Sequence, residues 1–266
     1  MNRLILVVAT AAVFGRDDAP AQSLASRIRT ARDGEVRLAF AAREGICGDG
    51  RTYIRDRSRG EGNYVMNNWS GGKGWRDRPC EEGPVRVALK VRDGEIRSAR
   101  TYVGGEWGNA GAGVTDLGTL GAKSAATGLI ELARTTEARG GEDVIFPATI
   151  ADSFVAWPPL LALAKDRSAN RSSRKQAVFW VSQAAGEKAA DGLSELVSDD
   201  GEDREVREQA VFALSQLPKD EGVPILVRVA KSNKDPEIRK KAMFWLGQSD
   251  DPRALALFEE ILSRPN

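Results

Sequence analysis

The hydrophobic positions in the first part of the chain repeat with a period of two. Val36, Leu38 and Phe40 alternate with polar or small residues, and residues 85–91 show the same alternation. This period is typical of a strand with one buried face and one face toward water. Asp93-Gly94 follows the second run and favours a two-residue hairpin, because a type I′ turn needs positive φ at both central residues.

The stretch that lies between these runs, residues 63–80, is rich in Gly and Asn. It predicts one more strand and a long loop. We therefore predict a small, mostly antiparallel β domain over residues 22–115.

After about residue 113 the hydrophobic period becomes 3.6, which is typical of amphipathic helices. A ten-residue phrase then occurs three times, 33 and then 32 residues apart: RKQAVFWVSQ at 174–183, REQAVFALSQ at 207–216 and RKKAMFWLGQ at 239–248. The register holds beyond each phrase, so that Leu193, Leu226 and Phe258 coincide, as do Leu196, Val229 and Ile261. Each unit therefore predicts two helices, the first carrying the phrase and the second carrying the apolar stripe.

Weaker copies of the second helix precede the phrase, with Leu160 and Leu163 in one and Leu129 and Leu132 in the other. Pro147 falls where a first helix is expected, and proline removes a helical hydrogen bond, so we predict that this helix is broken or shifted. The count is about four hairpins, the first incomplete. A lone hairpin cannot bury its apolar face, so the units must stack into a solenoid.

The turns and the phrase together carry a resemblance. KDPEIR at 234–239, EDREVR at 202–207 and the pattern RxxAxxxL resemble HEAT repeats over residues 141–264, in particular those of secreted bacterial HEAT-repeat proteins. The resemblance implies an α-solenoid over residues 116–266 that presents a long surface to other proteins, with the second helices on its concave side. The predicted fold class is α+β, a β-rich domain followed by this solenoid.

Composition weakens the case for catalysis and for nucleic-acid binding. The net charge is +1, whereas nucleic-acid binding usually needs a strong basic excess. Histidine is absent from the sequence, which removes the commonest general base and zinc ligand. We predict no enzyme, no metal and no cofactor. A carboxylate-based site at the domain junction, using a residue such as Asp49 in GICGDG, is the alternative, and a loop constrained by Cys47 is the favoured interpretation of that motif.

The N-terminus is typical of a secretory signal. Arg3 precedes an eleven-residue apolar run from Leu4 to Phe14, which is shorter than the ~20 residues that span a bilayer. Ala19-Pro20-Ala21 offers a cleavage site, so residues 1–21 are predicted to be a signal peptide; a short buried helix is the alternative. We expect a periplasmic or secreted mature chain without a membrane-spanning segment.

Cys47 and Cys80 are the two cysteines of the chain. In an oxidising compartment they predict a disulfide. A redox pair or a metal site is the alternative, but CxxC spacing and histidine are both missing.

Residues 22–115 contain 17 Arg and Lys against 12 Asp and Glu. Four arginines, Arg51, Arg55, Arg57 and Arg59, cluster near Tyr53. The bland interpretation is a solvated loop, and the functional one is an anion-binding loop that would make the protein an adaptor for an anionic envelope polymer.

Three kinds of recurring position are interpreted as structural. Arg174, Arg207 and Arg239 form a ladder expected to pair with acids of the turns, such as Glu202, Asp203 and Asp235. The recurring glutamines Gln183, Gln216 and Gln248 are expected to hydrogen-bond the chain where it turns, with a functional ladder as the alternative. Trp180 and Trp245 are expected to pack between neighbouring units.

Contact residues are sought among the positions that vary on the second helices. These are Lys188, Asp191, Glu195, Arg228, Lys231, Glu259 and Glu260. Their mixed signs favour a polar groove for a protein or peptide. The function that we predict is a non-catalytic interaction or scaffold protein of the cell envelope, with a partner that the sequence does not identify.

Overall fold

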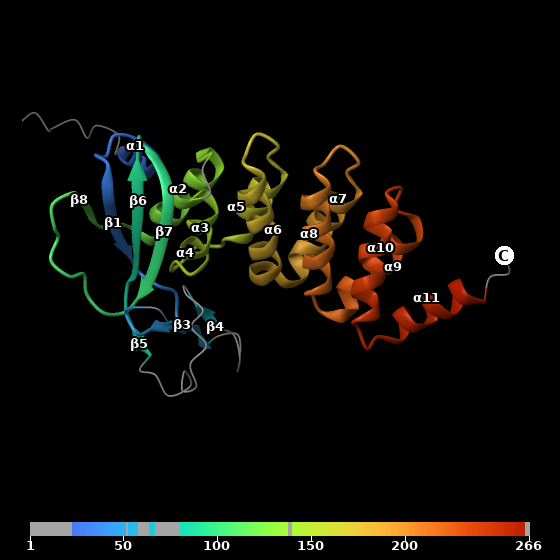
Figure 1. Cartoon of the computed structure of the whole chain (residues 1–266). Helices are drawn as coiled ribbons and strands as arrows, with labels where there is room; N and C mark the ends of the chain where they lie inside the picture. Colours follow the sequence, from blue (N-terminus) through green and yellow to red (C-terminus); the bar gives the residue numbers. More distant parts are fainter. Residues whose placement is uncertain (1–22, 52, 58–63, 67–79, 138–139, 264–266) are drawn as a thin grey trace, which may run out of the picture.

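The computed structural model describes residues 23–51, 53–57, 64–66, 80–137 and 140–263. A β region comes first and a run of helices follows, so the α+β fold class is confirmed (Figure 1). The predicted signal segment, residues 1–21, lies outside the described residues.

The β region contains two four-stranded sheets. The larger has the order β7-β6-β1-β8 and is built from β1 (Gly34–Phe40), β6 (Val85–Arg92), β7 (Glu95–Val103) and β8 (Val114–Thr119). The smaller has the order β4-β3-β2-β5 and is built from β2 (Ile46–Gly48), β3 (Tyr53–Asp56), β4 (Tyr64–Met66) and β5 (Glu81–Glu82). All neighbouring strands are antiparallel except β8, which runs parallel to β1. The strand β8 extends across residue 115, where the sequence placed the end of this region.

The turn between β6 and β7 has the geometry that its sequence predicts. Asp93 has φ 55° and Gly94 has φ 72°, as a type I′ turn requires. Val85, Val87, Leu89 and Val91 of β6 are buried on one face. The other face was expected to be exposed to solvent, but Arg86 on that face is buried, with 5% of its surface exposed.

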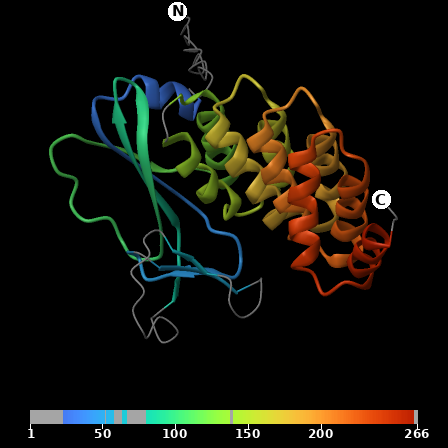
Figure 2. The ribbon, with the colours of Figure 1, turned by 45° about the vertical axis from the view of Figure 1, so that its right-hand side comes forward.

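Twelve helical segments are described. They are α1 (Leu24–Arg29), α2 (Ala122–Thr135), α3 (Gly140–Asp143), α4 (Ile145–Thr149), α5 (Trp157–Lys165), α6 (Arg171–Ala185), the 3-10 turn η3 (Gly186–Ala189), α7 (Ala190–Ser198), α8 (Arg204–Ser215), α9 (Lys219–Ser232), α10 (Pro236–Gly247) and α11 (Pro252–Leu262). The three phrases lie on α6, α8 and α10, which pack in succession, while α5, α7, α9 and α11 are the second helices. The units follow one another away from the sheet (Figures 1 and 2).

Local sequence explains where these helices start and stop. Asp235 and Asp251 each accept a hydrogen bond from a backbone N–H two residues later, and each is followed by a proline at the first helical position. The predicted break in the first unit is also observed, because α3 ends at Asp143 and α4 restarts at Ile145. Pro147 lies in the first turn of α4, where its missing N–H costs no helical bond.

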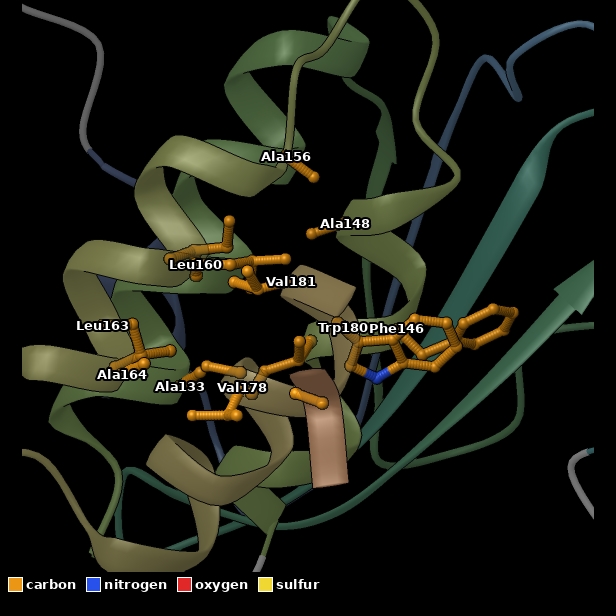
Figure 3. Close-up of a cluster of buried hydrophobic side chains, with 14 of the residues drawn as sticks. Ala133, Phe146, Ala148, Ala156, Leu160, Leu163, Ala164, Val178, Trp180 and Val181 are labelled. Atoms are coloured by element: carbon orange, nitrogen blue, oxygen red, sulfur yellow. The ribbon is translucent and has the colours of Figure 1, made fainter. Parts of the chain in front are cut away.

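The two regions share one hydrophobic core, a continuous cluster from Leu24 to Leu257. Figure 3 shows the part of it where α4, α5 and α6 meet, with Trp180 against Phe146. The chain after β1 adds two backbone hydrogen bonds to the loop after α4, Arg43 N–H to Ile150 O (2.9 Å) and Asp152 N–H to Ala41 O (2.9 Å). The helix α3 approaches β7 so closely that a Cβ on Gly140 would lie 2.3 Å from Ile96 O.

Candidate functional site: the seams between helical units

The first-helix arginines fasten each unit to its neighbours. Arg174 is 2% exposed; its guanidinium pairs with Glu202, lies 3.3 Å from an oxygen of Asp203 and donates to Ala164 O at 3.1 Å. Ala164 is in the last turn of α5, so this bond also satisfies a carbonyl that the helix leaves open.

Arg207 repeats the arrangement one unit later. Its guanidinium donates to Val197 O (3.1 Å), Asn233 Oδ1 (3.0 Å) and Asp235 Oδ2 (3.3 Å). Arg239 instead donates to the backbone oxygens of Asn233 (2.7 Å) and Lys234 (3.1 Å). Arg174 and Arg207 therefore bridge successive units, whereas Arg239 bonds the turn that precedes its own helix.

Towards the ends of α6 and α8, the serine that precedes each glutamine bonds the carbonyl three residues before it. Ser182 Oγ donates to Phe179 O and Ser215 Oγ donates to Phe212 O, both at 2.7 Å. The Gln216 amide donates to Ser215 Oγ at 3.1 Å, and Gln216 and Gln248 are exposed. Serine hydroxyls therefore bond carbonyls close to where the chain turns in these two units.

The two tryptophans lie between units. Trp180 of α6 stacks on Phe146 of α4 with ring centroids 5.1 Å apart, and Trp245 of α10 lies 5.0 Å from Phe212 of α8. Neither indole N–H has a hydrogen-bond partner among the described atoms. The rings are held by packing, and they serve as inter-unit contacts.

Six of the seven residues predicted to contact a partner lie on second helices, whereas Lys188 lies on η3, the 3-10 turn before α7. The structure divides the seven into two groups. Glu195 pairs with Lys165 of the preceding second helix, and Lys231 pairs with Glu260 of the following one at 2.6 Å. The remaining residues, Lys188, Asp191, Arg228 and Glu259, are exposed and form no ion pair with another described residue. The sequence did not separate these groups.

Hollows lie along the seams between units. One of about 370 Å³ lies among α3, α6 and α8 and includes Lys175, Phe179 and Gln209. A second of about 290 Å³ lies among α8, α9 and α10 and brings Gln216 and Gln248 beside Trp245. Another, of about 180 Å³, lies between α7 and α9 and includes Arg228.

Charged residues on the first helices and at the last turn also link neighbours. Lys175 and Arg171 of α6 lie 2.9 Å and 2.6 Å from oxygens of Glu205 on α8, and they lower the pKa of that carboxyl. The guanidinium of Arg253 donates two hydrogen bonds to the carboxylate of Asp251, at 2.8 Å and 2.7 Å. These bonds lower the pKa of Asp251 to about 2.

The carboxylate suggested for catalysis, that of Asp49, hydrogen-bonds the backbone of its own turn. Its Oδ1 accepts the backbone N–H groups of Arg51 and Tyr53, each at 2.9 Å, which holds the turn between β2 and β3. A carboxylate that lies where sheet and helices meet is that of Asp143, which accepts the N–H of Ala99 on β7 at 3.3 Å. Partial desolvation raises the pKa of Asp143, although its side chain stays exposed to solvent. Sequence reasoning missed Asp143 because its contact with β7 is a long-range one that the local pattern does not encode.

The predicted disulfide is confirmed. Cys47 of β2 and Cys80 are bonded, with Cα atoms 5.1 Å apart. No group of three or more potential ligands that could hold a metal ion occurs in the part of the chain that the structure describes.

The basic cluster of the β region is partly engaged by its own domain. Arg55 donates to Tyr53 Oη at 2.6 Å, and Arg57 lies near Glu82 and Cys80 O. Arg59 lies outside the described residues. The buried Arg86 donates to three backbone oxygens, those of Gly50, Gly104 and Glu106, and so ties the glycine-rich turns together.

No described helix combines the length and the apolar character that a membrane span requires.

Comparison with known families agrees with the helical architecture. The family model of HEAT repeats matches residues 199–266, which contain α8 to α11. This match supports a HEAT-repeat domain in the C-terminal part of the chain. No curated protein matches the chain.

Proposed function

We propose that this protein is a non-catalytic scaffold of the bacterial cell envelope that binds a protein partner through the second-helix face of its solenoid. The second-helix face is defined as the exposed side of η3, α7, α9 and α11. HEAT repeats suggest a protein-interaction role, and this supports the general class of function.

The observation that carries the proposal is a difference between the two sets of helices in how their charged side chains are engaged. The first-helix arginines Arg174 and Arg207 are buried and bonded to the neighbouring units. On the second-helix face Lys188, Asp191, Arg228 and Glu259 are exposed and lack described ion-pair partners. Exposed, mixed charge on a repeated surface suits a polar protein or peptide, because complementary charges set specificity and register.

A photo-crosslinking amino acid tests this surface directly. Incorporated in place of Lys188 or Glu259, it should give one discrete crosslinked protein in the native envelope. The control position is Arg92, whose side chain is 75% exposed on the β region. The same product from all three positions, or none from the two helical positions, would contradict the proposal.

The envelope location rests on the disulfide and on the signal-like N-terminus. Fractionation of a bacterial host should recover the mature protein outside the cytoplasm, beginning at Gln22. Recovery of the uncleaved chain in the cytoplasm with both cysteines reduced would overturn the location and leave the binding surface to be judged by crosslinking.

A further inference from the structure

A repeated ion pair links successive second helices, and the middle seam departs from it. In the repeat alignment, Lys165, Ser198 and Lys231 occupy one position on α5, α7 and α9. Glu195, Arg228 and Glu260 occupy the position that faces it on the following second helix. Lys165 pairs with Glu195 and Lys231 pairs with Glu260, so the rule holds at the first and last seams.

At the middle seam, between α7 and α9, both members of the ion pair are replaced by other residues. Ser198 stands where the lysine is expected and Arg228 stands where the glutamate is expected. Arg228 is exposed and makes no ion pair with a described residue, and Glu195, one unit earlier, is already paired with Lys165. The exchange therefore leaves a guanidinium available for a ligand.

This guanidinium lines the hollow of about 180 Å³ between α7 and α9. The other lining residues are Ser194, Ser198, Asp200, Val229, Ser232, Asn233 and Lys234. Lys234 is already paired with Asp200 at 2.8 Å, and Ser232 Oγ donates to Arg228 O at 2.9 Å. Ser194 and Ser198 lie one helical turn apart on α7 and line the same hollow as Arg228.

We propose that this hollow, the Arg228 groove, receives the carboxylate of an acidic side chain from the protein partner. A planar carboxylate accepts two parallel N–H bonds from a guanidinium and further bonds from hydroxyls. The size of the hollow is below the roughly 300–1,000 Å³ of drug-sized ligand sites and suits one side chain.

Charge favours a carboxylate over a phosphate in this groove. Arg228 is the one lining cation without an ion-pair partner among the described residues, and Asp200 contributes a negative charge at the rim. A phosphate group carries about −1.5 to −2 at neutral pH and needs more than one free cation. A monoanionic carboxylate matches the single available positive charge.

The proposal rests on the proposed function, and its test uses the whole mature chain with a defined probe. The probe is a short acetylated and amidated peptide of glutamate and glycine, and its control has glutamine in place of glutamate. Binding is followed by NMR through the guanidinium Nε signal of Arg228 and the amides of α7 and α9. We expect saturable shifts with the glutamate peptide and none with the glutamine peptide.

Three variants give the test its specificity. Arg228→Gln removes the charge, and the pair Ser198→Lys with Arg228→Glu rebuilds the ion pair of the other two seams. Both should stay folded and weaken peptide binding by about tenfold, the loss of one charge-assisted contact. Arg92→Gln removes an exposed cation of the β region, away from the second-helix face, and should leave the affinity unchanged.

Several outcomes overturn the proposal. These are equal binding by wild type and Arg228→Gln, absence of binding by wild type, and tighter binding of inorganic phosphate or a phosphoserine peptide than of the glutamate peptide. A partner crosslinked at Lys188 and bound equally by wild type and Arg228→Gln would preserve the scaffold function while removing this site. Binding of the glutamate peptide without any crosslinked partner would support the Arg228 groove and contradict the scaffold function.

Discussion

Trp245 of α10 packs against Phe212 of α8 with ring centroids 5.0 Å apart, across the seam between two helical units. Trp180 and Phe146 make the corresponding contact two units earlier at 5.1 Å. In both cases the tryptophan of one first helix packs against the phenylalanine of the first helix in the preceding unit. The stack is therefore stabilised by contacts between units, as a repeat protein requires.

Trp245→Ala should destabilise the stack more than truncation of its neighbour Phe244. We expect a loss of about 3 kcal/mol in the free energy of unfolding for Trp245→Ala, because large-to-small changes in packed aromatic sites cost this much. Phe244 is 55% exposed, so Phe244→Ala should cost about 1 kcal/mol. Urea unfolding followed by circular dichroism measures both, and equal losses would contradict the inter-unit role of Trp245.

The arginine ladder predicts unequal effects at equivalent positions. Arg174→Ala leaves Glu202 buried without its partner and should cost about 3–5 kcal/mol. Arg239→Ala removes bonds to two backbone oxygens at a partly exposed site and should cost about 1–2 kcal/mol. Thermal and urea unfolding compare them. If Arg239→Ala proves the more damaging, the buried ion pair is not what fastens the units.

Acid should weaken the last helix through Asp251. Its pKa is lowered to about 2 from 3.8, chiefly by its bonds with Arg253, so the stabilisation is present above pH 3.8 and is lost as the pH falls through 2. Asp251→Asn keeps a residue able to cap α11 and removes the charge. The variant should be less stable than wild type at pH 6, and the difference should shrink between pH 4 and pH 2. A difference that stays constant over this range would show that the charge contributes nothing.

Reduction of the disulfide should destabilise the β region. Cys47 and Cys80 are 33 residues apart, and closing a loop of this length contributes about 3–4 kcal/mol in the chain-entropy model. Cys47→Ser with Cys80→Ser should lower the unfolding midpoint in urea, and adding reductant should change wild type but not the variant. Equal midpoints for oxidised and reduced wild type would contradict a stabilising bond.

The helical part of the fold could be predicted because one pattern is written three times. The phrase fixes the register of α6, α8 and α10, and Pro147 indicates the break between α3 and α4 from its missing N–H. The strand β8 was harder to foresee. Its sequence, VTDLGT, has one exposed or half-buried residue after another and carries no apolar alternation. Its parallel pairing with β1 is a long-range contact that local sequence does not encode.

The candidate site was only partly accessible to sequence reasoning. Arg228 and Glu195 were selected together as variable second-helix residues, yet Glu195 is engaged with Lys165 and Arg228 is not. The signal that separates them is the repeat alignment of Lys165 with Lys231 and of Glu195 with Glu260. Its meaning depends on which helices face each other, and that follows from the packing rather than from the sequence.

The central claim is that the second-helix face binds a protein partner. The most direct measurement is the affinity of the purified, crosslink-identified partner for wild type and for a combined variant, Lys188→Glu, Asp191→Lys and Glu259→Lys. A control variant with Arg92→Glu and Arg97→Glu carries reversals on the exposed β region. We predict at least about tenfold weaker binding for the helical variant and wild-type affinity for the control. Wild-type affinity for the helical variant, with loss confined to the control, would contradict the account.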